Sequence, residues 1–112
     1  MAGKFELKLS ESGKYMFNLK AGNGQVILTS QMYEGKDGAL NGIESVKTNS
    51  ADDANFERLV SQGGDPYFTL KAGNGLVIGR SEMYKSDSAR DNGIESVRTN
   101  APGAALADIT EA

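Results

Sequence analysis

The sequence predicts an α+β fold in which two tandem β-β-β-α units share one antiparallel sheet. Both helices are expected on one face of that sheet, with a short closing strand at the C-terminus. Three observations lead to this prediction. The 112 residues suit one domain. Motifs of the first half recur in the second half. Within each half, apolar residues first alternate and then recur at helical spacing.

The internal repeat is the clearest feature of the chain. Residues 17–24, FNLKAGNG, return as residues 68–75, FTLKAGNG. Residues 41–46, NGIESV, return unchanged as residues 92–97. Over the 34 positions that start at Phe17, 20 are identical to the positions 51 residues further on, without a gap. The chain is therefore a tandem duplication.

The two copies are expected to form one domain over residues 1–112. Its pseudo-twofold repeats span about 5–55 and 56–106. A unit of 51 residues buries too little surface on its own, so the two units should share a sheet and a core. Residues 105–110 stand where a third unit would begin, and we predict that they form the closing strand.

Three strands should open each unit. In the first unit Phe5, Leu7 and Leu9 alternate with polar residues, which predicts a strand with one apolar face. The same alternation predicts a second strand over residues 15–21. Residues 25–29 are β-branched and aliphatic, which predicts a third strand.

Glycine-containing turns separate these strands. Ser12-Gly13 indicates the first turn, and Asn23-Gly24 favours a type I′ hairpin, in which both central residues have positive φ. The run at residues 21–24 also resembles a phosphate-binding loop. However, it joins two strands, and no G-K-[ST] motif follows. We interpret it as a hairpin turn, with an anion site as the alternative.

A helix is expected from residue 37 to residue 49, followed by its copy in the second unit. Ala39, Ile43, Val46 and Ser50 fall on one stripe at helical spacing. Asp37 is the expected N-cap of the first helix, and Ser86 or Asp87 that of the second.

Glycine interrupts both predicted helices at equivalent positions, Gly42 and Gly93. A glycine inside a helix costs about 1 kcal/mol relative to alanine. Its presence in both copies predicts close packing of the helix against a neighbouring element. A hinge, a ligand approach, or a shorter helix that begins at Ile43 are the alternatives.

Composition excludes much chemistry. Without Cys or His, the chain has no disulfide, thiol nucleophile, thiolate zinc site or histidine-based triad. We expect no enzyme activity, no metal and no cofactor. A carboxylate or lysine mechanism shared between the repeats is the alternative. No apolar run approaches 18 residues and no signal peptide is visible, so a cytoplasmic location without membrane contact is expected.

The sheet face opposite the helices is the expected contact surface, because nothing in the sequence covers it. The candidate binding residues on this face are Met16, Lys20, Tyr67 and Lys71. Tyr33 and Tyr84, which follow the third strands, complete the candidate set. They are expected to pack over the edge of the core, with stacking on a base or sugar as the alternative. We expect a non-catalytic binding or protein-interaction module whose partner is a protein or a small molecule. A net charge of −3 argues against nucleic acid. Single-stranded nucleic-acid contact on this face, through these lysines with Lys8 and Arg80, is the alternative. The chain is expected to be a monomer or a weak homodimer.

The repeated run Leu-Lys-Ala-Gly-Asn-Gly, then Met-Tyr, then Asn-Gly-Ile-Glu-Ser-Val resembles the tandem-repeat form of the YegP-like family, an uncharacterised bacterial family. The resemblance covers both repeats. It implies β(3)-α-β units that share a single sheet and exchange end strands. It also implies that the tandem form corresponds to a dimer fused into one chain. It supplies no catalytic residues.

Overall fold

Alternating apolar residues form two three-stranded meanders, one in each repeat. The computed structural model describes residues 3–110. The strands of the first unit are β1 (Lys4–Leu9), β2 (Tyr15–Lys20) and β3 (Val26–Ser30). Those of the second unit are β4 (Phe56–Val60), β5 (Pro66–Lys71) and β6 (Val77–Arg80). Neighbouring strands within each meander are antiparallel, as predicted.

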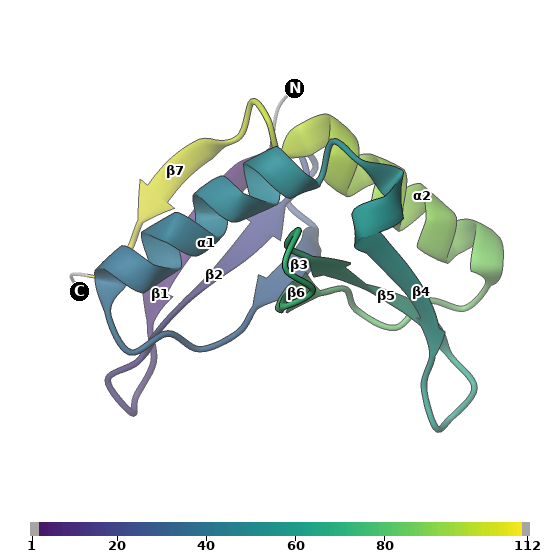
Figure 1. The fold of residues 1–112 in the computed structure, drawn as a ribbon, viewed down its shortest axis with the longest axis horizontal. Coiled ribbons are helices and arrows are strands. Elements are labelled where there is room, and N and C mark those ends of the chain that lie inside the picture. Colours follow the sequence, from purple (N-terminus) through teal and green to yellow (C-terminus); the bar gives the residue numbers. More distant parts are fainter. Residues whose placement is uncertain (1–2, 111–112) are drawn as a thin grey trace.

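The two meanders join edge to edge along β3 and β6, which completes one sheet of order β4-β5-β6-β3-β2-β1-β7. At this seam Thr29 lies directly opposite Arg80, the residue 51 positions later. The pseudo-twofold axis of the duplication therefore passes between these two residues. Both helices cover the same face of the sheet (Figure 1). The predicted architecture of two units on one shared sheet is confirmed.

The hairpin turns are longer than the predicted two-residue type. Gly24 has a φ of 87°, but no other residue type in the described part of the chain has positive φ, so Asn23 does not. The Gly24 N–H donates to the Ala21 carbonyl at 2.9 Å, and the Asn23 side chain accepts from the Gln25 N–H. This geometry matches a tight turn followed by a left-handed glycine. The type I′ prediction was wrong, and the run is a hairpin turn.

Helix α1 (Lys36–Asn49) buries Ala39, Ile43 and Val46 of the predicted stripe, and helix α2 (Asp87–Asn100) buries the equivalent Ile94 and Val97. The N-cap of α2 is Ser86, whose hydroxyl accepts from the Ala89 N–H at 3.1 Å. In α1 the N-cap is Gly35, which has no side chain to cap with. The prediction of Asp37 as a cap was therefore wrong, because it lies within the first turn. A short 3-10 helix, η1 (Asp53–Asn55), leads from α1 into β4.

The core lies between the helices and the sheet, and each unit contributes the same aromatic stack. The rings of Phe17 and Tyr33 lie 6.2 Å apart and nearly parallel, and Phe68 repeats the contact with Tyr84. Gly42 rests on the first stack, where an added Cβ would lie 3.0 Å from the Phe17 ring and nearer still to the Tyr33 hydroxyl. The predicted close packing at the helix glycines is confirmed.

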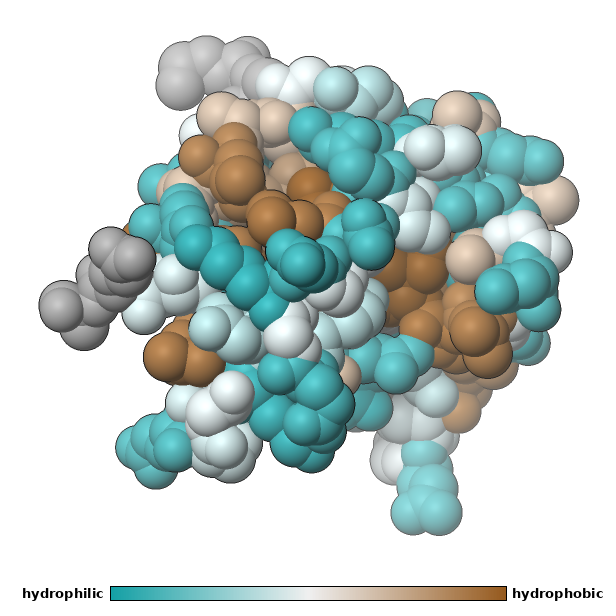
Figure 2. Space-filling model, turned by 60° about the vertical axis from the view of Figure 1, so that its left-hand side comes forward, coloured by the Kyte–Doolittle hydropathy of each residue, from teal (hydrophilic) through white to brown (hydrophobic). Residues whose placement is uncertain are grey.

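The closing strand β7 (Ala105–Asp108) is parallel to β1, so the sheet is mixed rather than wholly antiparallel. Helix α2 returns the chain to the end of the sheet where β1 begins, and β7 therefore starts opposite Lys4. It is also shorter than predicted. Leu106 on β7 is half exposed. Figure 2 brings this side of the molecule forward and shows apolar patches on its surface.

One ion pair ties β7 to helix α1. The Lys36 ammonium and the Thr110 hydroxyl and N–H hold the pKa of Asp108 at about 2, below its ordinary 3.8. A lowered pKa stabilises the folded state above pH 3.8, and this contribution disappears as the pH falls through about 2. We therefore expect β7 to loosen from β1 between these pH values.

Amide exchange measures this effect at the Ile109 N–H, which donates to the Leu7 carbonyl. Its protection factor should fall over this pH range more than that of Leu19, a core residue. Asp108→Asn should remove the difference. Equal pH dependence at Ile109 and Leu19 in the unmodified protein would contradict the expectation.

The two edges of the sheet differ in chemistry. The outer edge of β1 is paired with β7, whereas β4 has no outer partner within residues 3–110. Arg58 on β4 occupies the position of Leu7 in the first unit and forms salt bridges with Asp91 at 3.1 Å and Asp53 at 3.3 Å. Charged side chains on an edge strand discourage pairing with another chain. At this position the edge strand β4 therefore carries a charged side chain, whereas the paired strand β1 carries an apolar one.

Candidate ligand groove on the open sheet face

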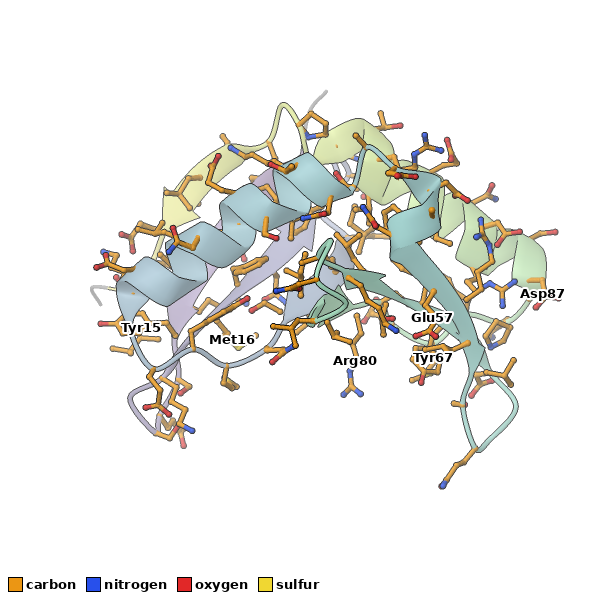
Figure 3. All side chains as sticks on the ribbon, in the orientation of Figure 1. Tyr15, Met16, Glu57, Tyr67, Arg80 and Asp87 are labelled. Carbon is orange, nitrogen blue, oxygen red and sulfur yellow. The ribbon has the colours of Figure 1, made fainter. Side chains whose placement is uncertain are left out.

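A groove of about 560 Å³ lies on the sheet face opposite the helices and crosses the seam between the repeats. Arg80 projects from β6 on the side away from the helices, between Met16 and Tyr67 (Figure 3). Both units contribute to the lining, which consists of Met16, Thr29, Ser30, Gln31, Met32, Tyr67, Thr69, Val77, Gly79 and Arg80.

Strand register explains why these side chains meet. Alternate residues of a strand share one face, and directly opposed residues on neighbouring strands lie side by side. The pairings form one polar row across the open face, in the order Glu57, Thr69, Arg80, Thr29, Asn18, Glu6. The groove occupies the middle of this row.

The two halves of the row differ in how their polar groups are satisfied. In the first unit the Asn18 amide donates to the Thr29 hydroxyl at 2.9 Å. In the second unit the equivalent pair is Thr69 and Arg80, and the Thr69 hydroxyl oxygen is buried without a hydrogen-bond partner. The exposed Arg80 side chain likewise has no hydrogen bond or ion pair within the described residues. The second unit therefore presents two unused polar groups to the groove.

The predicted lysines share this face but lie outside the groove. Lys20 forms a salt bridge with Glu6 at 3.1 Å, and Lys71 forms one with Glu57 at 3.1 Å. The Lys20 ammonium lowers the pKa of Glu6. Met16 and Tyr67, by contrast, line the groove. Of the predicted binding residues, only these two meet at the groove.

Tyr33 and Tyr84 lie on the helix side, where they stack on the core and contact the helix glycines. Burial raises the pKa of both phenols. Tyr33 also lines a smaller hollow of about 330 Å³ between α1 and the β5–β6 turn, whose lining contains no charged side chain. Neither tyrosine lines the open-face groove, although the hollow at Tyr33 shares Gln31 and Val77 with it.

Thr29 and Met32 were not predicted as site residues, and Thr69 was expected on the open face without being selected as a binding residue. A signal for Thr69 and Thr29 was present in the repeat, because these outward positions differ between the copies while the neighbouring core residues Phe17 and Leu19 recur as Phe68 and Leu70. Asn18 becomes Thr69, and Thr29 becomes Arg80. The asymmetry of the groove thus follows from the mismatches between the repeats.

The groove offers binding chemistry of three kinds. It has one guanidinium, one unused hydroxyl and apolar walls that include Met16 and Met32. Within residues 3–110, no group of three or more acidic side chains is placed to hold a metal ion. No helix in that range is long and apolar enough to cross a membrane.

The family model for a domain of unknown function, DUF1508, matches the chain twice, at residues 10–57 and 61–108. A UPF0339 protein of Bordetella pertussis is 56% identical over the full length of both chains. The UPF0339 protein in the ptx operon 5′ region of Stutzerimonas stutzeri is 49% identical, over 97% of this chain and 98% of that protein.

Two solution NMR structures match the fold. The UPF0339 protein SO3888 of Shewanella oneidensis has a TM-score of 0.92 and 52% identity, over 98% of this chain and 93% of that chain. The protein yegP of E. coli, of unknown function, has a TM-score of 0.95 and 43% identity, over 100% and 97%. The chain therefore belongs to the DUF1508 family of UPF0339 proteins and carries the family domain twice in tandem.

Proposed function

We propose that this protein is a non-catalytic binding protein and that the groove on the open sheet face is its ligand site. One observation carries the proposal. At the centre of the groove, Thr69 and Arg80 have no partners within the described residues, whereas the equivalent residues of the first unit form a satisfied pair. A buried polar group without a hydrogen bond destabilises a fold by about 1–3 kcal/mol. A ligand that bonds to Thr69 would remove this penalty.

The side chains available support binding rather than catalysis. The chain contains no His and no Cys, which are the usual proton-transfer and nucleophilic groups. On the open face the carboxylates of Glu6 and Glu57 are each engaged by lysine. Engagement in an ion pair favours a structural role for each carboxylate over proton transfer.

A chemical-shift screen of ¹⁵N-labelled protein against metabolites, mononucleotides and short peptides tests this proposal. We expect binders to shift the amide signals of Met16, Thr29, Tyr67, Thr69 and Arg80, because these residues line the groove. The signal of Glu95 on the solvent side of α2 should stay unchanged. If no compound shifts the groove signals, or if shifts gather on the helices, the groove is not the ligand site.

Single-stranded nucleic acid is a second candidate ligand for the same face, favoured by one observation. Three lysines surround Glu6, with Nζ–carboxylate distances of 3.5 Å for Lys4, 3.8 Å for Lys8 and 3.1 Å for Lys20. One carboxylate balances only one of them, so this end of the face is positive. Fluorescence anisotropy with labelled oligo-dT and oligo-U at low salt measures such binding. A salt-dependent affinity that Lys8→Gln weakens would support this candidate, and its absence would eliminate it.

A further inference from the structure

We propose that the groove selects a small molecule that carries one oxyanion, a carboxylate or a phosphate, on an apolar body. This inference rests on the proposed function and names the ligand class of the same site. Three features carry it: the unpaired polar groups at the seam, the pairing of nearby charges, and the apolar walls.

The oxyanion is assigned to Arg80 and Thr69, which lie directly opposite each other on β6 and β5. Side chains of opposed residues in an antiparallel pair start about 4.5–5.5 Å apart, so one ligand group can reach both. A guanidinium presents parallel N–H donors that match a carboxylate or phosphate, and a threonine hydroxyl adds a third donor. Because no partner among the described residues holds the exposed Arg80, its side chain is free to turn toward a ligand.

The charges around this pair favour an anion. The carboxylates that share the polar row, Glu57 and Glu6, each lie 3.1 Å from a lysine. Arg80 stands between them as a cation without a counterion in the described residues. Along the polar row of the open face, an incoming anion therefore finds the positive charge of Arg80, which is unpaired among the described residues, while both carboxylates of the row are already paired with lysines.

The apolar walls require more than a bare inorganic ion. Met16, Met32, Tyr67 and Val77 border the groove, and its volume of about 560 Å³ falls within the range for small organic ligands, about 300–1,000 Å³. Methionine adapts to irregular ligand shapes, and the Tyr67 ring offers a flat contact. Because the pseudo-twofold axis relates Arg80 to Thr29, only one of the two equivalent positions beside the axis carries a cation. A ligand with a single anionic end fits this asymmetry.

The test uses four probes on the full chain: 1-naphthoate, 1-naphthyl phosphate, the neutral 1-naphthylmethanol and inorganic phosphate. Affinities come from chemical-shift titrations of ¹⁵N-labelled protein. We expect the two naphthyl anions to shift Thr69 and Arg80 and to bind at least about tenfold more tightly than either the alcohol or inorganic phosphate, because a hydrogen bond to a charged group is stronger than a neutral one. The ratio of the two anions identifies carboxylate or phosphate as the preferred head group.

Three variants connect the selectivity to named groups. Arg80→Gln should reduce the preference for anion over alcohol to about one, and Thr69→Val should weaken the anions several-fold while leaving the alcohol unchanged. Arg98→Gln is the matched control, because Arg98 pairs with Glu95 on α2 away from the groove. It should alter no affinity.

The outcomes separate this inference from the proposed function. If the alcohol binds in the groove as tightly as the anions, the ligand class is wrong while the groove remains a ligand site. An Arg80→Gln variant that keeps the anion preference also overturns the inference. If none of the probes shifts the groove but an oligonucleotide does, the anionic small molecule is excluded in favour of nucleic acid. If neither the probes nor the wider screen shifts it, the inference and the proposed function both fail.

Discussion

Replacing Gly42 with alanine is expected to lower the free energy of unfolding by up to about 2 kcal/mol, although alanine is the better helix former. The gain in helix propensity is about 1 kcal/mol. Against it, the new Cβ would lie 3.0 Å from the Phe17 ring and 2.9 Å from the Tyr33 ring, and closer still to the tyrosine hydroxyl. Forcing extra volume into a packed core costs about 1–3 kcal/mol. The free-energy cost of the steric overlap should therefore exceed the gain in helix propensity.

Gly38→Ala is the matched control in the same helix. A Cβ at Gly38 would lie 3.4 Å from the Tyr33 ring, an ordinary contact, so this change should raise the stability by up to about 1 kcal/mol. Urea denaturation of both variants measures the difference. Tyr33→Phe in the Gly42→Ala background should restore part of the loss, because it removes the nearest atom. Equal stabilisation by the two alanines would refute the close-packing interpretation.

Periodicity and the repeat predicted most of the fold. The alternation of apolar and polar residues predicted six strands, and the recurrence of apolar residues at helical spacing predicted two helices. Both patterns arise because one face of each element is buried. The direction of β7 was beyond this reasoning. A parallel and an antiparallel strand show the same alternation of side chains, so the sequence of Ala105–Asp108 does not indicate in which direction the strand pairs. Only the path of the chain out of α2 decides that direction.

Local rules failed where two of them competed. Asn23-Gly24 favours a two-residue turn, but the longer turn satisfies the Asn23 side chain through the Gln25 N–H and needs a left-handed conformation only at Gly24. Asp37 was predicted as the N-cap because aspartate is a favoured residue at that position. The extended backbone at Gly35 nevertheless starts the helix at Lys36, before Asp37 is reached.

The candidate site was only partly predictable, because a sequence assigns residues to a face without showing their partners. Lys20 and Lys71 were predicted as binding residues, yet strand register brings a glutamate from the neighbouring strand to each. Arg80 looked equivalent to them and is unpaired within the described residues. Thr69 was expected on the open face, but a sequence does not show that its hydroxyl lacks a hydrogen-bond partner in the described part of the chain.

Thr69→Val and Thr29→Val are expected to change stability in opposite directions, although the two substitutions are chemically identical. Thr69→Val removes a buried hydroxyl that has no partner, which should raise the free energy of unfolding by about 1 kcal/mol. Thr29→Val removes the acceptor of the Asn18 amide and leaves that buried donor unpaired. This loss should lower the free energy of unfolding by about 1–3 kcal/mol.

Urea denaturation of both variants in ligand-free buffer checks the contrast, and the double variant Asn18→Leu with Thr29→Val should recover part of the loss by removing both partners. A destabilised Thr69→Val would mean that its hydroxyl is satisfied in the folded protein and would remove the main support for the groove. If Thr69→Val instead gains stability and loses anion affinity, then the Thr69 hydroxyl destabilises the ligand-free fold and contributes favourably only when an anion is bound. Residues that lower stability while serving a ligand are typical of functional sites. If Thr69 had only a structural role, its replacement by valine would not raise the free energy of unfolding and at the same time weaken anion binding.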